Sequence, residues 1–483
     1  MTGLATGAPS PTWLDAAAEE RLERTVRAAL RRARTSGSPV LASVTCSLGP
    51  AVDPTAVIVA SRAAGEDWFC YEQPDRDRAA LAALGTVRRL EARGEDRFRQ
   101  LAARWHALSA SALGDPDPSP PAPAGTGLVA VGGFAFAPDG GGSPQWSGFE
   151  PASLVVPEVA LARRGDDVRL TVALDVAPDD TLEDVLARGR GRLAGLRSAS
   201  LPLLDPDPTK RTRVLSPMPP SHFEQAVSQA VQQIHAARLK KVVLAREVQV
   251  HAPEPHDPAG ALAVLREAFP SCYVFAVGRG DAAFIAASPE LLVRRDGQRA
   301  STVALAGSTR RSADPAVDDH LGEQLLRSDK DREENAIVAR RIARTLRPHA
   351  VWVTAAPEPV LIRIANIQHL AMPIRAQLTA PLGAVELAGL LHPTPAVGGE
   401  PAAAAAQLIP ALEGLDRGWY AGPVGWTDAA GDGEFCVALR CALLRGAVAH
   451  CYAGCGIVRD SSPEAELAES EVKLEAMLPV LAS

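Results

Sequence analysis

The chain has 483 residues, of which 47% are apolar, and its 50 basic and 57 acidic groups give a formal net charge of −7. Because nucleic-acid binding depends on clustered basic side chains that displace counterions, this charge argues against nucleic acid as the main partner. No uninterrupted apolar stretch approaches the roughly 20 residues of a membrane span, and no cationic start precedes an apolar run that would mark a signal peptide. We therefore expect a globular protein of the cytoplasm.

Lysine is scarce, because only five of the 50 basic residues are lysines: Lys210, Lys240, Lys241, Lys330 and Lys473. None of them follows a glycine, which excludes the Walker A loop of a P-loop nucleotidase. The ten histidines contain no H-E-x-x-H pair, and the seven cysteines contain no C-x-x-C pair. A zincin helix, a zinc knuckle and a disulfide framework are therefore not indicated, and we expect reduced thiols.

The first half of the chain begins with a predicted helix over residues 13–35, which have a charged amphipathic pattern. Residues 40–46 and 57–59 then have the apolar runs of strands. Residues 68–71 (WFCY) and 128–136 (LVAVGGFAF) are predicted as buried strands that share one sheet.

A proline-rich segment, residues 114–125 (GDPDPSPPAPAG), separates the last two of these strands. Its proline content is incompatible with a helix or a central strand. Because the strands on either side need a common sheet, we interpret the segment as a surface loop and not as a domain linker. Residues 1–483 are accordingly predicted to form one domain, in which residues 1–210 are the half with the less specific motifs.

The second half has more regular patterns. Ser221 and Glu224 match a capping box, and apolar residues at helical spacing continue to about Arg238. Residues 241–250 are the next predicted strand.

A hairpin is predicted further along the chain. Residues 284–294 and 300–305 are two strands around an Asp-Gly turn. One long helix is expected over 318–346, and the last helix is expected to begin with Ser462 as N-cap and Pro463 at its first position. Strands that come in runs and hairpins favour an α+β architecture over a doubly wound sheet.

Two residues on these strands carry ionisable groups in apolar surroundings. Lys241 opens the apolar run KVVLAR, where a lysine is usually a solvated edge residue but can also supply a removable proton, which arginine cannot. Glu290 follows Ser288-Pro289, a sequence that normally starts a helix. Since the run after it ends too soon for a helix, we expect Glu290 at the start of a buried strand, where its raised pKa would suit a general acid.

A cluster of carboxylates is predicted near the C-terminus. Glu466 and Glu469 stand three residues apart on one helical face, and Lys473 follows four residues later, so an ordinary surface salt bridge explains part of the pattern. Glu334 in the acidic run DREENAIVARRI offers a third carboxylate. Three carboxylates without histidine or cysteine would make an oxygen-only site suited to Mg²⁺.

Two glycine-bearing turns, at Gly307-Ser308 and around Gly454, either pack closely or present backbone amides to an anion. Cys455 stands between glycines but does not match the G-x-C-x-G elbow of a glutamine amidotransferase.

In their order and their amino-acid sequence, these segments resemble those of the chorismate-utilising enzymes, and within them the isochorismate synthases. The similarity is most specific over residues 216–478 and looser before them. The matching stretches are KVVLAR (241–246), ASPELLVRRDG (287–297), LAGSTRR (305–311), SDKDREENAIV (328–338), QHLAMPI (368–374), LHPTPAVGG (391–399), GPVGW (422–426), GEFCVALRCA (433–442) and YAGCGIVRDSSPEAELAESEVKLEAML (452–478). The resemblance implies an α+β fold of large antiparallel β-sheets packed together, with helices on the outside.

The resemblance also implies a reaction and its residues. Lys241 corresponds to the base that activates water for attack at C2 of chorismate, and Glu290 to the acid that protonates the departing C4 hydroxyl. The implied ligands of Mg²⁺ are Glu334, Glu466 and Glu469. The implied substrate contacts are Gly307, Ser308, His369, Ala396, Arg440, Gly454 and Lys473. The other three lysines are expected to be surface groups: Lys210, Lys240 and Lys330.

Lys241, Ala306 and Ala396 favour water over ammonia as the nucleophile, because amine-adding relatives typically carry other residues there. We therefore expect no glutamine amidotransferase subunit. A salicylate synthase, which goes on to eliminate pyruvate, and a non-catalytic chorismate-binding subunit remain as alternatives. Two departures from the family pattern are Ala286, where glycine is usual, and Asn335, where histidine often follows the metal glutamate.

Overall fold

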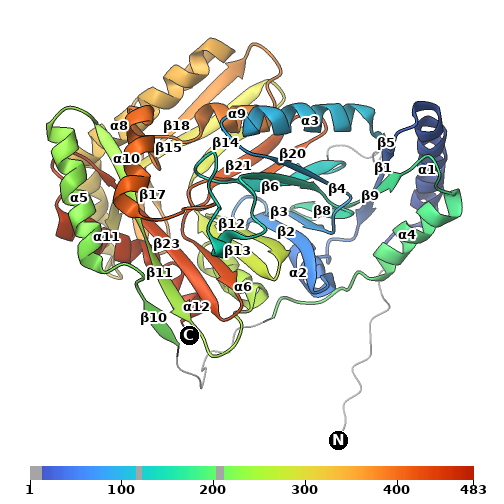
Figure 1. Cartoon of the computed structure of the whole chain (residues 1–483), viewed down its shortest axis with the longest axis horizontal. Helices are drawn as coiled ribbons and strands as arrows, with labels where there is room; N and C mark the ends of the chain where they lie inside the picture. The colour runs from blue at the N-terminus through green and yellow to red at the C-terminus, as the bar shows by residue number, and fades with distance from the viewer. Residues whose placement is uncertain (1–12, 116–121, 203–211, 483) are drawn as a thin grey trace, which may run out of the picture.

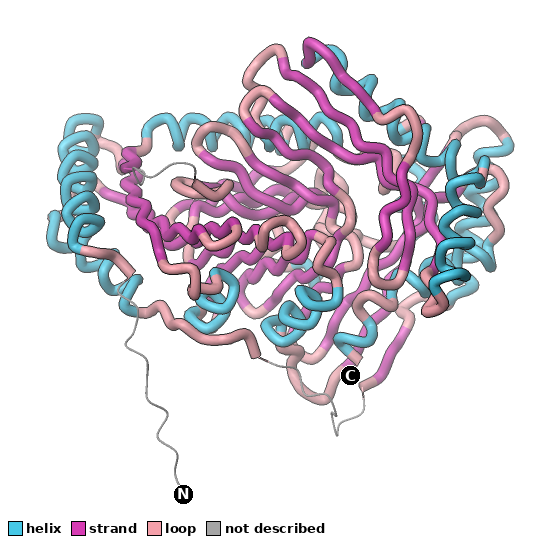
Figure 2. The backbone as a smooth tube through the Cα atoms, turned by 180° about the vertical axis from the view of Figure 1, so that it is seen from behind, coloured by secondary structure: helices cyan, strands magenta, loops and turns pink. Residues whose placement is uncertain are grey.

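The computed structural model describes residues 13–115, 122–202 and 212–482. This part of the chain forms two large sheets, of 13 and 10 strands, that are antiparallel except where β5 pairs with β1. Helices lie around the outer margins of both sheets, as views from the front and from behind agree (Figures 1 and 2). This confirms the predicted α+β class.

The 13-stranded sheet contains strands from both halves of the chain. In spatial order it consists of β10 (Arg213–Leu215), β11 (Lys241–His251), β23 (Val448–Ile457), β22 (Cys441–Arg445), β13 (Ala282–Ser288), β12 (Tyr273–Gly280), β2 (Gly65–Gln73), β3 (Ala79–Leu84), β8 (Val159–Arg164), β9 (Asp167–Val176), β1 (Val40–Leu48) and β5 (Leu113–Asp115), with β19 (Gly399–Glu400) also paired to β11.

The 10-stranded sheet packs against the first. Its order is β16 (Ala350–Ala355), β18 (Ile367–Leu378), β15 (Arg299–Arg310), β14 (Leu291–Asp296), β21 (Gly433–Val437), β20 (Pro423–Asp428), β6 (Val129–Phe134), β7 (Ala152–Val156) and β4 (Arg88–Ala92), with β17 (Val360–Arg363) paired to β18.

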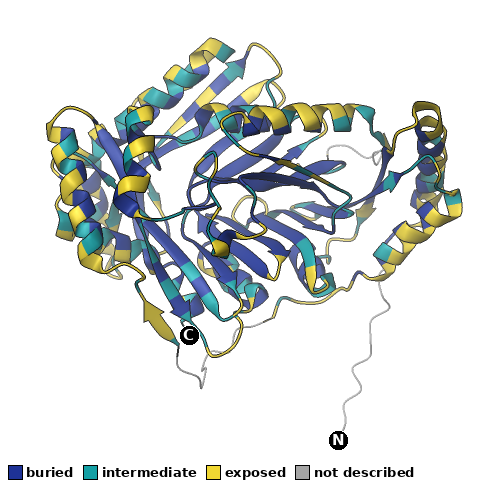
Figure 3. Cartoon of the chain, in the orientation of Figure 1, coloured by how far each residue is buried: buried dark blue, intermediate teal, exposed yellow. Residues whose placement is uncertain are grey.

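The helices are α1 (Ala16–Ser36), α2 (Pro54–Ser61), α3 (Arg97–Ser111), α4 (Leu182–Ala194), α5 (Pro220–His235), α6 (Pro258–Ala268), α7 (Pro315–Arg327), α8 (Asp329–Leu346), α9 (Ala384–Leu391), α10 (Ala402–Glu413), α11 (Pro463–Leu474) and α12 (Leu478–Leu481), with short 3₁₀ turns at Pro144–Trp146 and Arg347–His349. Their outward faces are exposed and the strands beneath them are largely buried (Figure 3). None of these helices has the length and apolar character needed to cross a membrane.

The elements of the first half agree with the prediction only in part. The predicted helix at 13–35 is α1, but residues 57–59 lie in α2 and not in a strand, because Asp53 caps the helix and Pro54 opens it. A short apolar run is compatible with either a helix or a strand, and the helix cap decides between them.

The strands at 68–71 and 128–136 lie in different sheets, so the expectation of a common sheet is wrong. Of the proline-rich loop, residues 116–121 lie outside the described part of the chain.

Helix starts in the second half also differ from the prediction. The helix after Ser216 begins at Pro220 with Pro219 as its N-cap, so Ser221 and Glu224 form no capping box. The long helix predicted over 318–346 is two helices, because Ser328 ends α7 and its hydroxyl accepts a hydrogen bond from the Asp331 amide at the start of α8. The predicted cap at Ser462 is present at α11.

The chain passes between the two sheets at Pro289 and Glu290. The strand predicted over 284–294 is therefore two strands, β13 in one sheet and β14 in the other. A second passage, Ala438–Arg440 between β21 and β22, runs beside it. The Ala287 amide donates to the Arg440 carbonyl at 3.0 Å, and the Val437 amide donates to the Glu290 carbonyl at 3.0 Å. These two passages place Glu290 and Arg440 together at the seam between the sheets.

Candidate active site

A cavity opens at this seam and brings together most of the residues singled out in the sequence. Ten of the predicted residues line it: Glu290, Gly307, Ser308, Glu334, His369, Ala396, Arg440, Gly454, Glu469 and Lys473. The other two, Lys241 and Glu466, are buried directly behind the wall, where they meet Glu334 and Glu469 respectively. Residues far apart in the sequence thus share one site.

Lys241 is buried at the first position of β11, and its side chain is only 1% exposed. Its ammonium forms an ion pair with Glu334 of α8, with 2.8 Å between Nζ and Oε1. The neighbouring strand β23 has Gly456 at this point. A Cβ added there would lie 2.2 Å from Glu334 Oε1 and 3.0 Å from Lys241 Cε, so glycine gives the pair its space.

Glu290 is 3% exposed, and its carboxyl group has no hydrogen-bond partner among the residues that the structure describes. Burial raises the pKa of Glu290 to about 8, although the positive charges of Lys241, Arg440 and Lys473 act in the opposite direction. The group is therefore a protonated acid at neutral pH. Its uncharged form is the one that can give up a proton.

Arg440, beside Glu290 at the seam, is hydrogen-bonded to His369. The Arg440 guanidinium donates to His369 Nε2 at 2.7 Å, and both residues are buried. Burial and the adjacent Arg440 charge lower the pKa of His369 well below its ordinary value, so the imidazole is neutral. Arg440 also has a φ of 46°, an unusual conformation for arginine that directs its side chain into the site.

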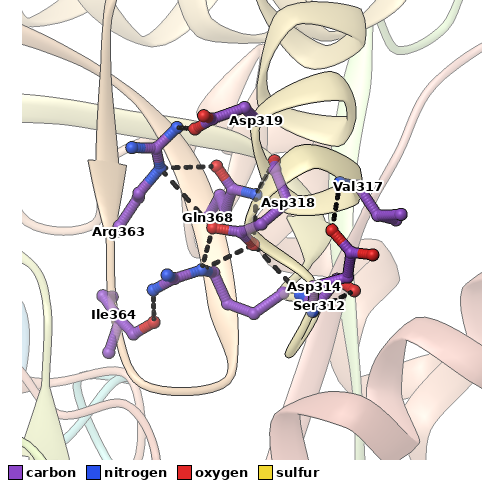
Figure 4. A network of polar contacts seen from close by, with 9 residues as sticks. Ser312, Asp314, Val317, Asp318, Asp319, Arg363, Ile364 and Gln368 are labelled. Atoms are coloured by element: carbon purple, nitrogen blue, oxygen red, sulfur yellow. Dashed lines mark hydrogen bonds and ion pairs between the residues drawn. The ribbon is translucent and has the colours of Figure 1, made fainter.

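The strand that carries His369 is held at its start by a polar network (Figure 4). Gln368 is fully buried and donates to both the carbonyl and the carboxylate of Asp318, at 2.9 and 3.0 Å. The Asp318 carboxylate also accepts from Arg311 at 2.8 and 2.9 Å. Because Arg311 directly follows β15 and Gln368 directly precedes His369, this network fixes the two strands next to the site.

The C-terminal helix α11 supplies the acidic side of the cavity. Lys473 Nζ lies 2.7 Å from Glu469 Oε1 and donates to the Gly454 carbonyl at 2.8 Å. Ser308 donates to the same carboxylate oxygen of Glu469 at 2.9 Å. The Glu469–Lys473 pair expected at the surface is thus partly buried beside the cavity. Although burial alone would raise it, the pKa of Glu469 is lowered by Lys473 and Ser308.

The donor set of this side fits Mg²⁺. Cys455, Glu466 and Glu469 have potential ligand atoms within 4.8 Å of one another, and Glu334 lines the same cavity. Burial raises the pKa of Cys455 well above its ordinary value, and its thiol donates to the Glu466 carbonyl at 3.2 Å, so it is not a thiolate ligand. Burial and the nearby Glu469 charge raise the pKa of Glu466. Crowded carboxylate oxygens that repel one another are ligands that a hard divalent cation prefers.

The two departures from the family pattern have structural explanations. Asn335 is fully buried, and its amide nitrogen donates to the carbonyls of Ala304, Ala306 and Leu370 at 2.9 to 3.3 Å, which ties α8 to β15 and β18 beside Glu334. Ala286 pairs regularly with Cys441 in the sheet and packs in the apolar core, so its methyl group is accommodated.

Two tyrosines of the cavity wall were missed in the sequence. Tyr420 and Tyr452 have ring centroids 5.3 Å apart. A Cβ at Gly454 would lie 2.7 Å from Tyr420 Oη, which explains why glycine stands there. Tyr452 lies within the motif YAGCG, but a sequence search for charged groups and glycines passes over it. Lys330 and Lys240 are exposed as expected, but Lys330 also pairs with Glu466. Lys210 lies outside the described residues.

Together, the fold and the cavity define an α+β enzyme with a site for a small anionic molecule. The family described as "Chorismate binding enzyme" matches residues 28–482, and the chain belongs to it. The family predicted from the sequence motifs is thus confirmed.

Two relatives and one solved structure are similar to the chain over most of its length. The chain is 36% identical over 465 residues to the "Salicylate biosynthesis isochorismate synthase" of Pseudomonas aeruginosa, covering 96% of this chain and 94% of that protein. It is 31% identical to isochorismate synthase MenF of Bacillus subtilis, covering 86% and 87%. Among solved structures, the menaquinone-specific isochorismate synthase MenF of Escherichia coli matches with a TM-score of 0.75 and 26% identity, over 95% of this chain and 100% of that one.

Proposed function

We propose that this protein is an isochorismate synthase that converts chorismate reversibly to isochorismate in the presence of Mg²⁺. The observation that carries the proposal is the presence, at one cavity, of a protonated buried Glu290 in the lining and a buried Lys241 directly behind it. An acid and an amine in one site are what the exchange of a hydroxyl group between two ring carbons requires. The two relatives with 31 and 36% identity, both named isochorismate synthases, support the same reaction.

In the proposed mechanism, Lys241 acts as general base. The neutral amine takes a proton from water as the water oxygen bonds to C2 of the ring. Because Lys241 is paired with Glu334, that ion pair must open before the amine can serve as base. Lysine suits this role because its ammonium can lose a proton near neutral pH in a suitable site, whereas the guanidinium of arginine cannot.

Glu290 acts as general acid in the same step. As the ring double bonds shift, the C4 hydroxyl leaves with the Glu290 proton as water. One water enters and one leaves, so substrate and product are isomers and the reaction is reversible. The raised pKa of Glu290, about 8, keeps this proton available at neutral pH.

The cations and amides around the cavity hold the substrate, which carries two carboxylates. Arg440, with its planar fork of donors, and Lys473 are suited to these carboxylates. Neutral His369, already bonded to Arg440, orients the guanidinium. Small residues complete the pocket at places where bulkier side chains would fill it, namely Gly307, Ser308, Gly454 and Ala396.

Glu334, Glu466 and Glu469 would hold Mg²⁺, which when bound would neutralise the ring carboxylate of the substrate. Their fit to a hard cation supports this assignment. We place the reaction in the cytoplasm, where the seven buried cysteines stay reduced. We further propose one domain for residues 1–483 and no amidotransferase subunit.

Product analysis tests the proposed function. Purified protein is incubated with chorismate and Mg²⁺, and the products are separated by chromatography. We expect isochorismate alone. Fluorescent salicylate would identify a salicylate synthase, and binding of chorismate without turnover would identify a non-catalytic subunit; either result contradicts the proposal.

A further inference from the structure

Three of the five lysines are paired with the three proposed metal ligands, one with each. The ion pairs are Lys241–Glu334 at 2.8 Å, Lys473–Glu469 at 2.7 Å and Lys330–Glu466 at 3.4 Å. In this structure the ammonium groups therefore neutralise the carboxylates that a divalent cation would bind. Two of the three lysines have proposed roles in catalysis and substrate binding, whereas Lys330 has none.

Lys330 differs from the other two in its position. Its side chain is 40% exposed, against 1% for Lys241 and 14% for Lys473, and it does not line the cavity. It lies at the beginning of α8, one turn before Glu334. Its side chain is thus partly exposed to solvent while it contacts the Glu466 carboxylate. The ammonium can therefore leave Glu466 for solvent without being buried elsewhere.

We propose that Lys330 is the resident counter-cation of the metal site, which Mg²⁺ displaces from Glu466, and that it thereby limits the affinity of the site for Mg²⁺. This inference rests on the proposed metal site. The ammonium contacts the Glu466 carboxylate, which would also be a ligand of Mg²⁺, and a positive charge beside the site would oppose a second one. Lys330 is thus a positioning residue for Glu466 in the metal-free protein and a competitor for it during metal binding.

Metal binding to the purified, metal-free protein tests the proposal without any substrate. We expect Lys330→Met to bind Mg²⁺ about two- to fivefold more tightly than the unmodified protein in calorimetric titrations, because a partly exposed ion pair of up to about 1 kcal/mol no longer has to be broken. Lys330→Arg, which keeps the cation, should leave the affinity close to the original value.

Lys240→Met is the matched control, since it removes an exposed lysine that pairs with no carboxylate in the described part of the chain. It should leave the Mg²⁺ affinity unchanged. Lys330→Gln serves as a second neutral variant, and thermal unfolding of each metal-free variant verifies its fold. Unchanged or weaker Mg²⁺ binding in both neutral variants overturns the proposal.

The outcomes also separate this inference from the proposed function. If the unmodified protein binds no Mg²⁺, the inference about Lys330 is overturned whatever the protein does with chorismate. If Lys330→Met binds Mg²⁺ more tightly and the unmodified protein makes no isochorismate, the inference stands and the proposed function fails.

Discussion

Replacing Glu290 by glutamine should make the stability of the protein less sensitive to pH. Burial raises the pKa of this carboxyl from 4.5 to about 8 in the folded protein. Below pH 4.5 the group is protonated in both the folded and the unfolded chain and does not lower the free energy of unfolding. Between pH 4.5 and 8 the folded state binds more protons than the unfolded state, so stability falls by up to about 1.4 kcal/mol per pH unit. Above about pH 8 the free energy of unfolding is lower by the full amount, on the order of 4 to 5 kcal/mol.

Glutamine cannot ionise, so Glu290→Gln removes this pH-dependent cost while leaving the volume of the side chain nearly unchanged. We expect the thermal midpoint of the variant, relative to the unmodified protein, to rise between pH 5 and pH 8.5. For a chain of this length, about 1 kcal/mol corresponds to roughly 1 °C, so the relative rise should be about 4 °C. The comparison is a double difference, so effects of the substitution that do not depend on pH cancel. A constant offset at both pH values would refute the reasoning.

Three further predictions concern catalysis. The forward kcat/KM should begin to fall near pH 8 on its alkaline side, since only protonated Glu290 is the acid; a profile that rises through pH 9 contradicts this. Lys241→Ala should lower kcat by about 10³-fold or more with the fold retained by circular dichroism, and near-normal turnover would exclude the base. Gly456→Ala should raise the Mg²⁺ concentration for half-maximal activity about tenfold, because its methyl group would displace Glu334, 2.2 Å away; an unchanged requirement would mean that Glu334 is not a ligand.

Much of the site could be predicted from the sequence, because its residues lie in short segments with distinctive sequence motifs. The segments around Lys241, Glu290 and Glu469 each combine a chemical group with the residues that position it. The structure brings Glu290 and Glu469 into the lining of one cavity and Lys241 directly behind it, and the family is confirmed. Individual roles remain predictions for the experiments above.

Long-range arrangement could not be predicted in the same way. The apolar run before and after Glu290 has the pattern of one strand. The passage between sheets at Pro289 depends on the neighbouring antiparallel passage at Ala438–Arg440, about 150 residues away. The same limit applies to Lys330, whose partner Glu466 lies 136 residues further along the chain. The local pattern shows that Lys330 is polar, but only the folded structure shows that its side chain, on α8, meets the Glu466 carboxylate of α11.

The origin of the hydroxyl oxygen in the product tests the central claim most directly. The protein is incubated with chorismate and Mg²⁺ in water enriched in ¹⁸O, and isochorismate is analysed by mass spectrometry. If Lys241 activates a water molecule that attacks C2 while Glu290 releases the C4 hydroxyl, the product contains one heavy oxygen atom per molecule. Isochorismate without heavy oxygen would show that the original hydroxyl is transferred within the substrate, which would contradict the account.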